Sequence, residues 1–474
     1  MPFPVLGSNS AVAGGYEINN SLRFNEGDDA KLSFDPASAG NVDTMTLSFW
    51  MKPDLNFGGD HNNIFSVRPS AGSYAMLVHR TGGEILFEHS GAGDILKTNR
   101  LFRDPSAWYH IVLALDSTNS TAALRARLYV NGIEETSFAT DNRASHSQNT
   151  DFLFGGTNPH QISGDPTGGS FYGGYLSEMY YVNGSQLAPT EFGEFNENGV
   201  WVPIRYSGSY GTNGFKLEFQ DSGNLGDDTS GNGNDFTATN LAAFDITTDT
   251  PTNNFCTMNP LATGSRSDFR EGNSQVKTNV QGSVPYGQVE FGTFFVNKGK
   301  WYYEAKISSV GSGGKMGLGW NERYESGNYT NSHNNIGSNG NALYSHQGDI
   351  KIGSGSDFST GVDSYTTNDI IGCAIDLDNN KVYWHKNGNY QDDPTPNPAS
   401  NDGRSLGTAT YNNTWTPWVT KDDTINNCNV KFNFGNPPYT NSSSQSDDNG
   451  YGDFEYDVPT GFYSLCTKNL AEFG

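Results

Sequence analysis

The chain has 474 residues, about three times the length of a common domain, so we expect two or three domains. Glycine occurs 57 times and charged residues make up only 17% of the chain, against an average of about 25% charged residues. Neither an apolar heptad nor a Gly-x-y repeat runs through it, which excludes coiled coils and collagen. The net charge of −24 disfavours nucleic acid and anionic membranes as partners, because their phosphates would repel the chain.

The cysteines are too few for a disulfide framework, and none forms a CxxC pair. They are Cys256, Cys373, Cys428 and Cys466. Residues 1–22 contain no Lys or Arg and no long apolar run, so no secretory signal is visible. No apolar stretch reaches the roughly 18 residues of a membrane helix. We expect buried cysteines and a chain that neither inserts into a membrane nor is exported by a cleaved signal.

Short runs in which apolar and polar residues alternate indicate β-strands throughout. They include residues 45–51, 110–115 and 126–130. Asn-Gly pairs that follow such runs favour tight hairpins, since both turn positions need a positive φ; they are Asn131-Gly132, Asn183-Gly184 and Asn387-Gly388. Strands with one apolar face must pack sheet on sheet. The sequence therefore predicts an all-β fold of two tandem antiparallel β-sandwiches.

The alternation stops between Gly223 and Asn254, where few apolar residues occur. This stretch predicts an inter-domain linker, residues 224–255. Residues 1–20 are Gly-rich and mostly uncharged, and we interpret them as an N-terminal arm that docks onto another subunit. The two β-domains are then residues 21–223 and residues 256–474.

Four motifs of the first half occur in the order found in the laminin-G-like family, whose fold is the concanavalin A-like jelly roll. They are MTLSFWMKP (residues 45–53), SAWYHIVLALDST (106–118), RLYVNG (127–132) and FYGGYLSEMYYVNG (171–184). Residues 21–223 therefore resemble a laminin-G-like domain. The resemblance implies a jelly-roll sandwich of a kind used in recognition.

The second half resembles a SPRY domain, over roughly residues 301–465. The motifs are GKWYYEAKI (299–307), KMGLGW (315–320), DIIGCAIDLDNNKVYWHKNG (369–388) and VKFNFGNPP (430–438). In the first of them, Trp301, Tyr303 and Ala305 share one strand face, while Tyr302 and Glu304 share the other. One face would be core, and the other could line a binding surface.

Two further segments resemble virion proteins of tailed bacteriophages, especially marine ones. They are the joining stretch from DDTSGNGNDF (227–236) to TDTPTNNF (248–255) and the ending VPTGFYSLCTKNL (458–470). The resemblance implies a place in a virion, where no secretory signal is needed because lysis releases the protein.

No catalytic constellation is visible. Glycosidases need two carboxylates placed across a cleft, and the acidic clusters at residues 191–197 and 455–457 do not have the Glu-x-Asp-x-Glu pattern of a catalytic strand. The GxSxG string at residues 403–407 lacks the strand and helix of a nucleophile elbow. Nine histidines are scattered singly. We predict no catalytic residue, no metal ligand and no enzymatic activity.

Calcium is the one candidate cofactor, because laminin-G-like domains often bind it through loop oxygens. The oxygens on offer are those of Asp221, Asp227, Asp228, Asn232 and Asn234. A flexible acidic linker accounts for the same residues, and we prefer that interpretation. The expectation is no cofactor, with calcium as the alternative.

Aromatic residues in polar loops of the second half are the candidate ligand contacts. Tyr324 and Tyr329 lie in a loop after residues 315–320, and Trp415 lies before another strand. In SPRY domains such loops form the binding edge, where exposed rings stack on sugars or anchor a protein. Packing is the competing explanation, above all for Trp418, which we expect to face the core with Val419 facing away.

Together these observations predict a non-enzymatic bacteriophage structural protein, located in the virion, that binds a host-surface glycan or protein. A tail fibre or another appendage fits best, and capsid decoration or a head fibre is the alternative position. The alternative from another class is a secreted carbohydrate-active enzyme. The partners would be other virion subunits and the host ligand, and a homotrimer stays open because no residue specifies a three-fold contact.

Overall fold

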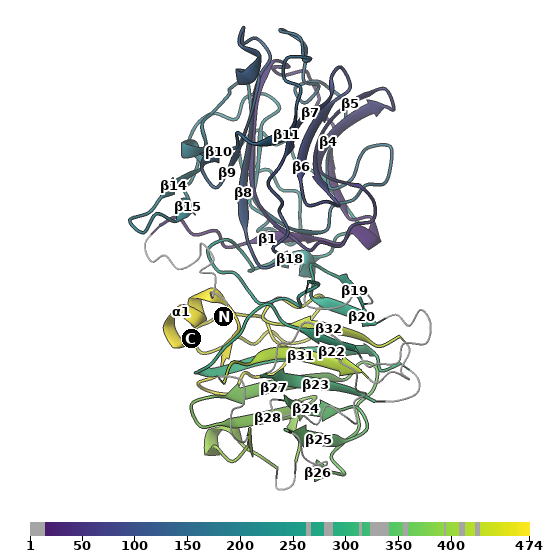
Figure 1. Ribbon diagram of the computed structural model, residues 1–474, viewed down its shortest axis with the longest axis vertical. Helices are drawn as coiled ribbons and strands as arrows, with labels where there is room; N and C mark the ends of the chain where they lie inside the picture. Colours follow the sequence, from purple (N-terminus) through teal and green to yellow (C-terminus); the bar gives the residue numbers. More distant parts are fainter. Residues whose placement is uncertain are drawn as a thin grey trace. The chain divides into compact units, whose positions relative to one another are not determined.

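The computed structural model describes residues 15–261, 267–278, 288–311, 315–322, 341–353, 359–392, 395–406, 413–421 and 427–474. The chain forms two compact units that divide between Thr252 and Asn253. Each unit consists of predominantly antiparallel β-sheets, so the predicted tandem β-sandwich fold is confirmed (Figure 1). Within the described ranges the only α-helix is α1 (Thr467–Phe473), and no helix there is long and apolar enough to cross a membrane.

In the first unit, the sheet that we call sheet I has the strand order β10-β9-β8-β3-β13-β1-β18, and β16 also pairs with β13. Its strands are β1 (Ser21–Phe24), β3 (Thr44–Pro53), β8 (Tyr109–Asp116), β9 (Ala126–Val130), β10 (Ile133–Glu134), β13 (Gly174–Asn183), β16 (Phe215–Leu217) and β18 (Ile246–Thr247). A separate hairpin joins β14 (Gly193–Phe195) to β15 (Trp201–Pro203).

Sheet II of the first unit has the order β11-β7-β6-β5-β4-β12-β2-β17. Its strands are β2 (Lys31–Phe34), β4 (His61–Ser70), β5 (Ser73–Arg80), β6 (Ile85–His89), β7 (Gly93–Thr98), β11 (Phe138–Asp141), β12 (His160–Ile162) and β17 (Thr237–Thr239). Phe49 of β3 belongs with Phe65 of β4 and Phe87 of β6 to one buried cluster. This apolar layer between the sheets is the core of the unit.

The outer face of sheet I is also covered. Thr46, Ser48 and Trp50 point away from the core, yet each is at most 1% exposed. Thr46 donates a hydrogen bond to the carbonyl of Ser185, and Trp50 packs in a cluster with Trp201. The segment that follows β13 therefore lies over this sheet.

Residues 224–252 of the predicted linker are part of the first unit, and residues 253–255 belong to the second. Leu225 and Phe236 lie in the core cluster of the first unit, β17 pairs with β2, and β18 pairs with β1. The two edge strands are only three and two residues long, which is too short for an alternating pattern to reveal them. From the predicted arm, Ile18 is buried and hydrogen-bonds to Thr252; residues 1–14 lie outside the described ranges.

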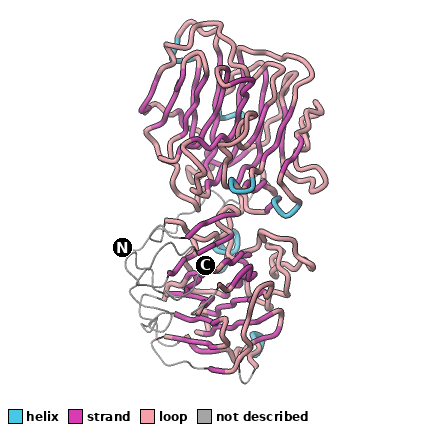
Figure 2. The backbone as a smooth tube through the Cα atoms, turned by 90° about the vertical axis from the view of Figure 1, so that its right-hand side faces the viewer, coloured by secondary structure: helices cyan, strands magenta, loops and turns pink. Residues whose placement is uncertain are grey.

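In the second unit, sheet III has the order β19-β20-β32-β22-β27-β28-β29, with β30 on β28 and β33 parallel to β22. Its strands are β19 (Ser267–Arg270), β20 (Gln275–Thr278), β22 (Lys300–Ser309), β27 (Ile370–Asp376), β28 (Lys381–Lys386), β29 (Asn389–Tyr390), β30 (Arg404–Ser405), β32 (Asn429–Asn433) and β33 (Tyr463–Ser464). Figure 2 shows that strands and loops make up most of the tube.

Sheet IV of the second unit has the order β21-β31-β23-β24-β25-β26. Its strands are β21 (Gln288–Phe291), β23 (Met316–Asn321), β24 (Asn341–Ser345), β25 (Asp349–Ile352), β26 (Ser359–Thr360) and β31 (Thr416–Lys421). Among the described residues, short 3-10 helices occur at Glu26–Asp28, Ala122–Leu124, Pro189–Glu191, Ala243–Asp245 and Pro398–Ser400.

The predicted faces of β22 are confirmed, but neither of them is an open surface. Trp301, Tyr303 and Ala305 lie in the core cluster between the sheets. Tyr302 and Glu304 are equally buried, because residues 454–462 lie over them: Tyr302 packs with Phe454 and Phe462. The binding surface that we considered on this face is therefore covered by the chain itself.

Two of the three Asn-Gly pairs form the expected hairpins. Asn131 and Gly132 have positive φ between β9 and β10, as do Asn387 and Gly388 between β28 and β29. Asn183 instead ends β13, and the chain continues over sheet I.

Candidate functional site

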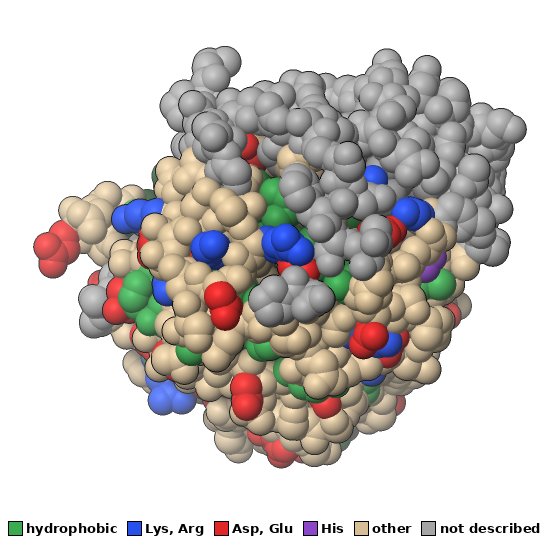
Figure 3. Space-filling view, turned by 90° about the horizontal axis from the view of Figure 1, so that it is seen from below, with side chains coloured by type: hydrophobic (Ala, Val, Ile, Leu, Met, Phe, Trp, Pro, Cys, Tyr) green, Lys and Arg blue, Asp and Glu red, His purple; other side chains and the backbone are tan. Residues whose placement is uncertain are grey.

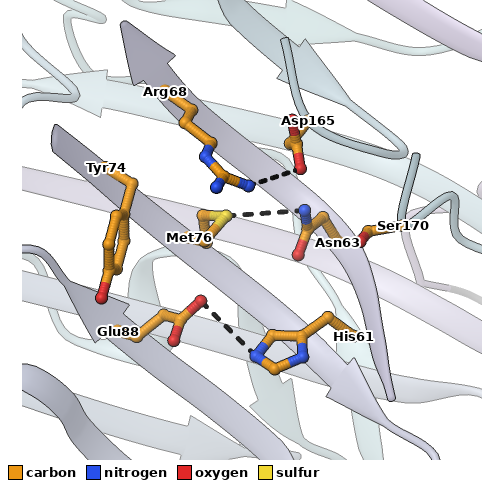
Figure 4. A pocket seen from close by; sticks show the side chains of 8 residues that line it. All are labelled: His61, Asn63, Arg68, Tyr74, Met76, Glu88, Asp165 and Ser170. Carbon is orange, nitrogen blue, oxygen red and sulfur yellow. Dashed lines mark hydrogen bonds and ion pairs between the residues drawn. The ribbon is translucent and has the colours of Figure 1, made fainter. Parts of the chain in front are cut away.

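A polar pocket of about 320 Å³ lies on the outer face of sheet II (Figure 4). We call it the sheet II pocket. It is lined by His61, Asn63, Arg68, Tyr74, Met76, Glu88, Asp165 and Ser170. The strands β4, β5 and β6 supply its floor, and the loop after β12 supplies Asp165 and Ser170.

A β-bulge in β4 places both Asn63 and Arg68 on the face that lines the pocket. Asn63 pairs with Val78 and Phe65 with Leu77, so Ile64 is an extra residue in the ladder. In a regular strand, Asn63 and Arg68 would point to opposite faces because their spacing is odd. The bulge shifts the alternation by one, so both line the pocket while Phe65 stays in the core.

The loop over the pocket is held by backbone and side-chain hydrogen bonds. The amide of Asn63 donates to the carbonyl of Ser170 at 2.7 Å, and Ser66 Oγ donates to the carbonyl of Gly164 at 2.8 Å. Gly168 and Gly169 both have φ of 95°, which only glycine adopts without strain. Asp165 therefore has a fixed position at the rim.

Charged side chains occupy two opposite sides of the pocket. Arg68 Nη1 lies 2.9 Å from Asp165 Oδ2, and His61 Nε2 lies 3.7 Å from Glu88 Oε1. Burial, with the carboxylates of Glu88 and Asp94, raises the pKa of the Tyr74 phenol. The phenol is therefore protonated at neutral pH and can donate a hydrogen bond.

Two buried polar atoms in the pocket have no hydrogen-bond partner among the described residues. They are Asn63 Oδ1, an acceptor, and Arg68 Nε, a donor. A buried polar group without a partner costs about 1–3 kcal/mol. A ligand with hydroxyl groups, each of which donates and accepts, can satisfy both atoms, while Tyr74 and Met76 offer apolar surface to its carbon atoms.

The two carboxylates of the pocket are occupied within the protein. Asp165 Oδ1 accepts from the amide of Thr167 and Oδ2 accepts from Arg68, while Glu88 faces His61. A glycosidase needs one acid to protonate the leaving group and one to act as base or nucleophile. The arrangement suits binding better than hydrolysis.

Of the three predicted aromatic contacts, the structure describes Trp415 alone and places it in the core. Trp415 is only 2% exposed, since it pairs with Val296 in a β-bridge and its ring enters the core cluster of the second unit. Val419 shares this core face, whereas Trp418 packs on the other face with Leu343, the reverse of our expectation. Tyr324 and Tyr329 lie outside the described residues.

Two of the candidate calcium ligands, Asp228 and Asn232, make hydrogen bonds within their own loop and to neighbouring backbone. Asp228 accepts hydrogen bonds from the amides of Lys216, Ser230 and Asn234. Asn232 donates from its side chain to the carbonyls of Gly211 and Gly214. No group of three or more His, Cys, Asp or Glu side chains that could hold a metal ion occurs among the residues that the structure describes.

A buried Ser48–His110 pair resembles a catalytic dyad but has the wrong tautomer. Trp201 Nε1 donates to His110 Nδ1 at 3.0 Å, so the ring proton of His110 lies on Nε2. His110 Nε2 is 2.9 Å from Ser48 Oγ and therefore donates to it. It cannot remove the serine proton, and both residues are at most 1% exposed.

Sequence reasoning missed the sheet II pocket because it depends on contacts between distant segments. Arg68 and Asp165 are 97 residues apart, and the bulge at Ile64 breaks the alternation that we used to assign faces. One signal was present: β4 and β6 carry charged side chains at Arg68 and Glu88, next to apolar core residues.

Comparison with known families assigns a domain to each unit. Residues 25–190 match the concanavalin A-like lectin/glucanases superfamily, and residues 300–403 match the SPRY domain. The first unit thus contains a concanavalin A-like domain and the second a SPRY domain. No protein of curated function matches the chain.

Among solved structures, the SPRY domain of human HERC1 is 17% identical, with a TM-score of 0.28, and the match covers 37% of this chain and 96% of that one. The heptameric SAP-like pentraxin of Limulus polyphemus is 15% identical, with a TM-score of 0.26, and the match covers 37% and 80%. A human SPRY domain is 14% identical, with a TM-score of 0.23, and the match covers 34% and 90%.

Proposed function

We propose that this chain is a non-catalytic structural protein of a bacteriophage virion, a tail fibre or another appendage, that binds a host-surface glycan through the sheet II pocket. The observation that carries the binding part is the pair of buried, unpartnered atoms in that pocket, Asn63 Oδ1 and Arg68 Nε. Laminin-G-like and SPRY domains are both typical binding modules, which supports adhesion over catalysis.

The pocket favours a neutral polyhydroxylated ligand. Its cationic Arg68 is already matched by Asp165, so an anionic ligand would have to displace a carboxylate at 2.9 Å. Sugar hydroxyls satisfy the orphaned donor and acceptor without displacing any charge. The ring of Tyr74 is half-buried and presents the flat surface on which sugars stack.

The pocket is tested by glycan-array binding of the purified chain. We expect Tyr74→Ala to weaken binding at least about tenfold, since it removes an aromatic side chain that lines the pocket. Phe195→Ala is the matched control, because Phe195 is a 51% exposed aromatic residue on β14, outside the pocket. If both variants bind like the wild type, the glycan site lies elsewhere.

The virion part rests on the resemblance of residues 227–255 and 458–470 to phage virion proteins. Cryo-electron microscopy of purified particles tests it, and we expect the chain in an appendage with the sheet II pocket facing outward. Its position on the capsid surface would favour decoration or a head fibre, and its absence from particles would contradict the virion proposal. Other virion subunits, and copies of this chain in a trimer, are the partners that such a map identifies.

The alternative of a secreted carbohydrate-active enzyme has its own experiment. Incubation of the chain with the glycans that it retains on the array should leave them intact. Release of shortened glycans by the wild type, but not by Glu88→Gln, would instead identify Glu88 as an acid of a glycosidase.

A further inference from the structure

Lys52 and Asp249 form a buried ionic contact at one end of the first unit. Lys52 Nζ lies 2.7 Å from Asp249 Oδ2, and the two side chains are 1% and 2% exposed. Lys52 belongs to β3, and Asp249 follows β18, the last strand of the unit. The contact therefore joins a central strand of sheet I to the end of the same unit.

Aromatic side chains surround the contact. Lys52 Nζ lies 5.5 Å from the ring centroid of Tyr175, and Trp108 Nε1 donates a 3.1 Å hydrogen bond to Asp249 Oδ1. Trp108 and Tyr175 belong to a buried cluster with Ile18, Trp50 and Trp201. A charged pair in such surroundings gives up most of its hydration, so a neutral product of the same two groups is favoured there.

The carboxyl group is held for attack by the amine. Ser21 Oγ donates to the carbonyl oxygen of Asp249 at 2.6 Å, which fixes the backbone. Trp108 fixes Oδ1 and would stabilise negative charge that develops on that oxygen. Oδ2 is then the oxygen that faces Lys52 and can leave.

We propose that Lys52 and Asp249 condense to an intramolecular isopeptide bond. One proton moves from Nζ to Oδ2, which leaves a neutral amine beside a carboxylic acid. The lone pair of Nζ attacks Cγ, the Cγ–Oδ2 bond breaks, and a second proton from Nζ joins the departing oxygen. An ammonium and a carboxylate thus become a secondary amide and one water molecule, with no oxidant, reductant or co-reactant.

An isopeptide bond would give the first unit a covalent cross-link that its cysteine content does not allow otherwise. All four cysteines lie in the second unit, at Cys256 and beyond, so the first unit cannot form a disulfide. The proposed bond joins residues 197 positions apart, which encloses most of the unit in one covalent loop. A cross-link over so long a loop restricts the unfolded chain strongly, by the same argument that applies to disulfides.

Intact mass spectrometry of the denatured full chain tests the proposal. We expect the mass of the wild type to be lower, by one water molecule, than the mass calculated from its sequence. The Lys52→Arg variant should have the mass calculated from its own sequence. Lys216→Arg is the matched control, because Lys216 is also buried and paired, with Glu218 at 2.6 Å, and this variant should still lack the water. Trp108→Phe should lower the fraction of cross-linked chains.

Peptide sequencing decides where the water is lost, since a succinimide at another aspartate changes the mass equally. After protease digestion, we expect one branched peptide that joins the Lys52 and Asp249 segments. A wild type with its full sequence mass, or a lost water without the branched peptide, overturns the proposal. The decisive measurements are made on the wild type, so they test the proposal even if a variant fails to fold.

Discussion

Glu304 shows how one buried side chain can hold a covering segment in place. Its Oε1 accepts hydrogen bonds from Tyr302 and from the amide of Tyr456, and its Oε2 accepts from Asn433 and from the amide of Glu455. His385 Nδ1 accepts from the amide of Gly388, so Nε2 carries the proton and donates to Tyr302. The carboxylate thus anchors residues 455–456 over sheet III.

We expect Glu304→Gln to destabilise the second unit by about 2–4 kcal/mol. A glutamine turns one acceptor oxygen into an amide donor that faces existing donors, and each buried unsatisfied group costs about 1–3 kcal/mol. Urea unfolding of the full chain measures the loss, and Glu472→Gln on the exposed face of α1 is the control. A loss equal to that of the control would mean that residues 455–456 are held by packing alone.

The pairing of β27 with β28 depends on a glycine at one cross-strand position. Gly372 pairs with His385, and the imidazole ring lies where a side chain at residue 372 would be: a Cβ there would sit 1.9 Å from Nε2. Gly372→Ala must therefore displace His385 and break its hydrogen bond to Tyr302. We expect a loss of about 1–3 kcal/mol, as for overpacking.

Thermal unfolding of Gly372→Ala measures this loss, with Gly72→Ala as control, because a Cβ at residue 72 meets no atom within 4 Å. The mechanism predicts a second signature: a double variant Gly372→Ala/His385→Ala should be less unstable than the sum of the single variants, since the clash is then gone. Additive losses would show that the glycine acts through backbone conformation instead.

At the scale of elements, sequence alternation predicted which residues share a strand face, but not what covers that face. Tyr302 and Glu304 were placed together from the pattern of β22 alone. Their burial depends on residues 454–462, about 151 residues further along the chain, and no local pattern reports that contact. The sheet II pocket was not predicted from the sequence for a related reason. One extra residue at Ile64 reverses the alternation of side chains along β4.

At the scale of the whole molecule, composition and turn residues were enough to predict two β-sandwiches, because a chain rich in short amphipathic strands has few other ways to bury them. The end of the first unit was harder to predict. Residues 224–252 have the composition of a linker, yet they form two edge strands of the first unit. Each strand is too short to show an alternating pattern in the sequence. Acidic and basic side chains are scattered over the face seen in Figure 3, and neither sign gathers there.

The two units are expected to differ in their stability at acidic pH, because they differ in their buried histidines. In the first unit, burial lowers the pKa of His79 and His89 to about 4 and that of His110 to about 3, and it also lowers those of His146 and His160. In the second unit, burial lowers the pKa of His385 to about 3 and that of His346 as well, while it raises the pKa of Glu304 to about 7.

The signs of these shifts oppose each other. A histidine with a lowered pKa in the folded state is protonated first in the unfolded chain, so stability is lost as the pH falls from about 6.5 to about 4. A carboxyl with a raised pKa binds its proton first in the folded state, so stability is gained as the pH falls from about 7 to about 4.5. In the first unit the pKa values of Glu178, Asp227 and Asp245 are raised too, so the expectation rests on the larger number of buried histidines in that unit.

We therefore expect the first unit to unfold at a higher pH than the second when the chain is acidified. Incubation across this window, followed by a short hydrogen-exchange pulse at one fixed pH, assigns the loss of protection to each unit. His79→Gln should move the transition of the first unit to lower pH, because a glutamine can still donate to the carbonyl of Phe102 but does not titrate. Loss of protection in the second unit first would contradict the argument, since it would mean that other groups govern the response to acid.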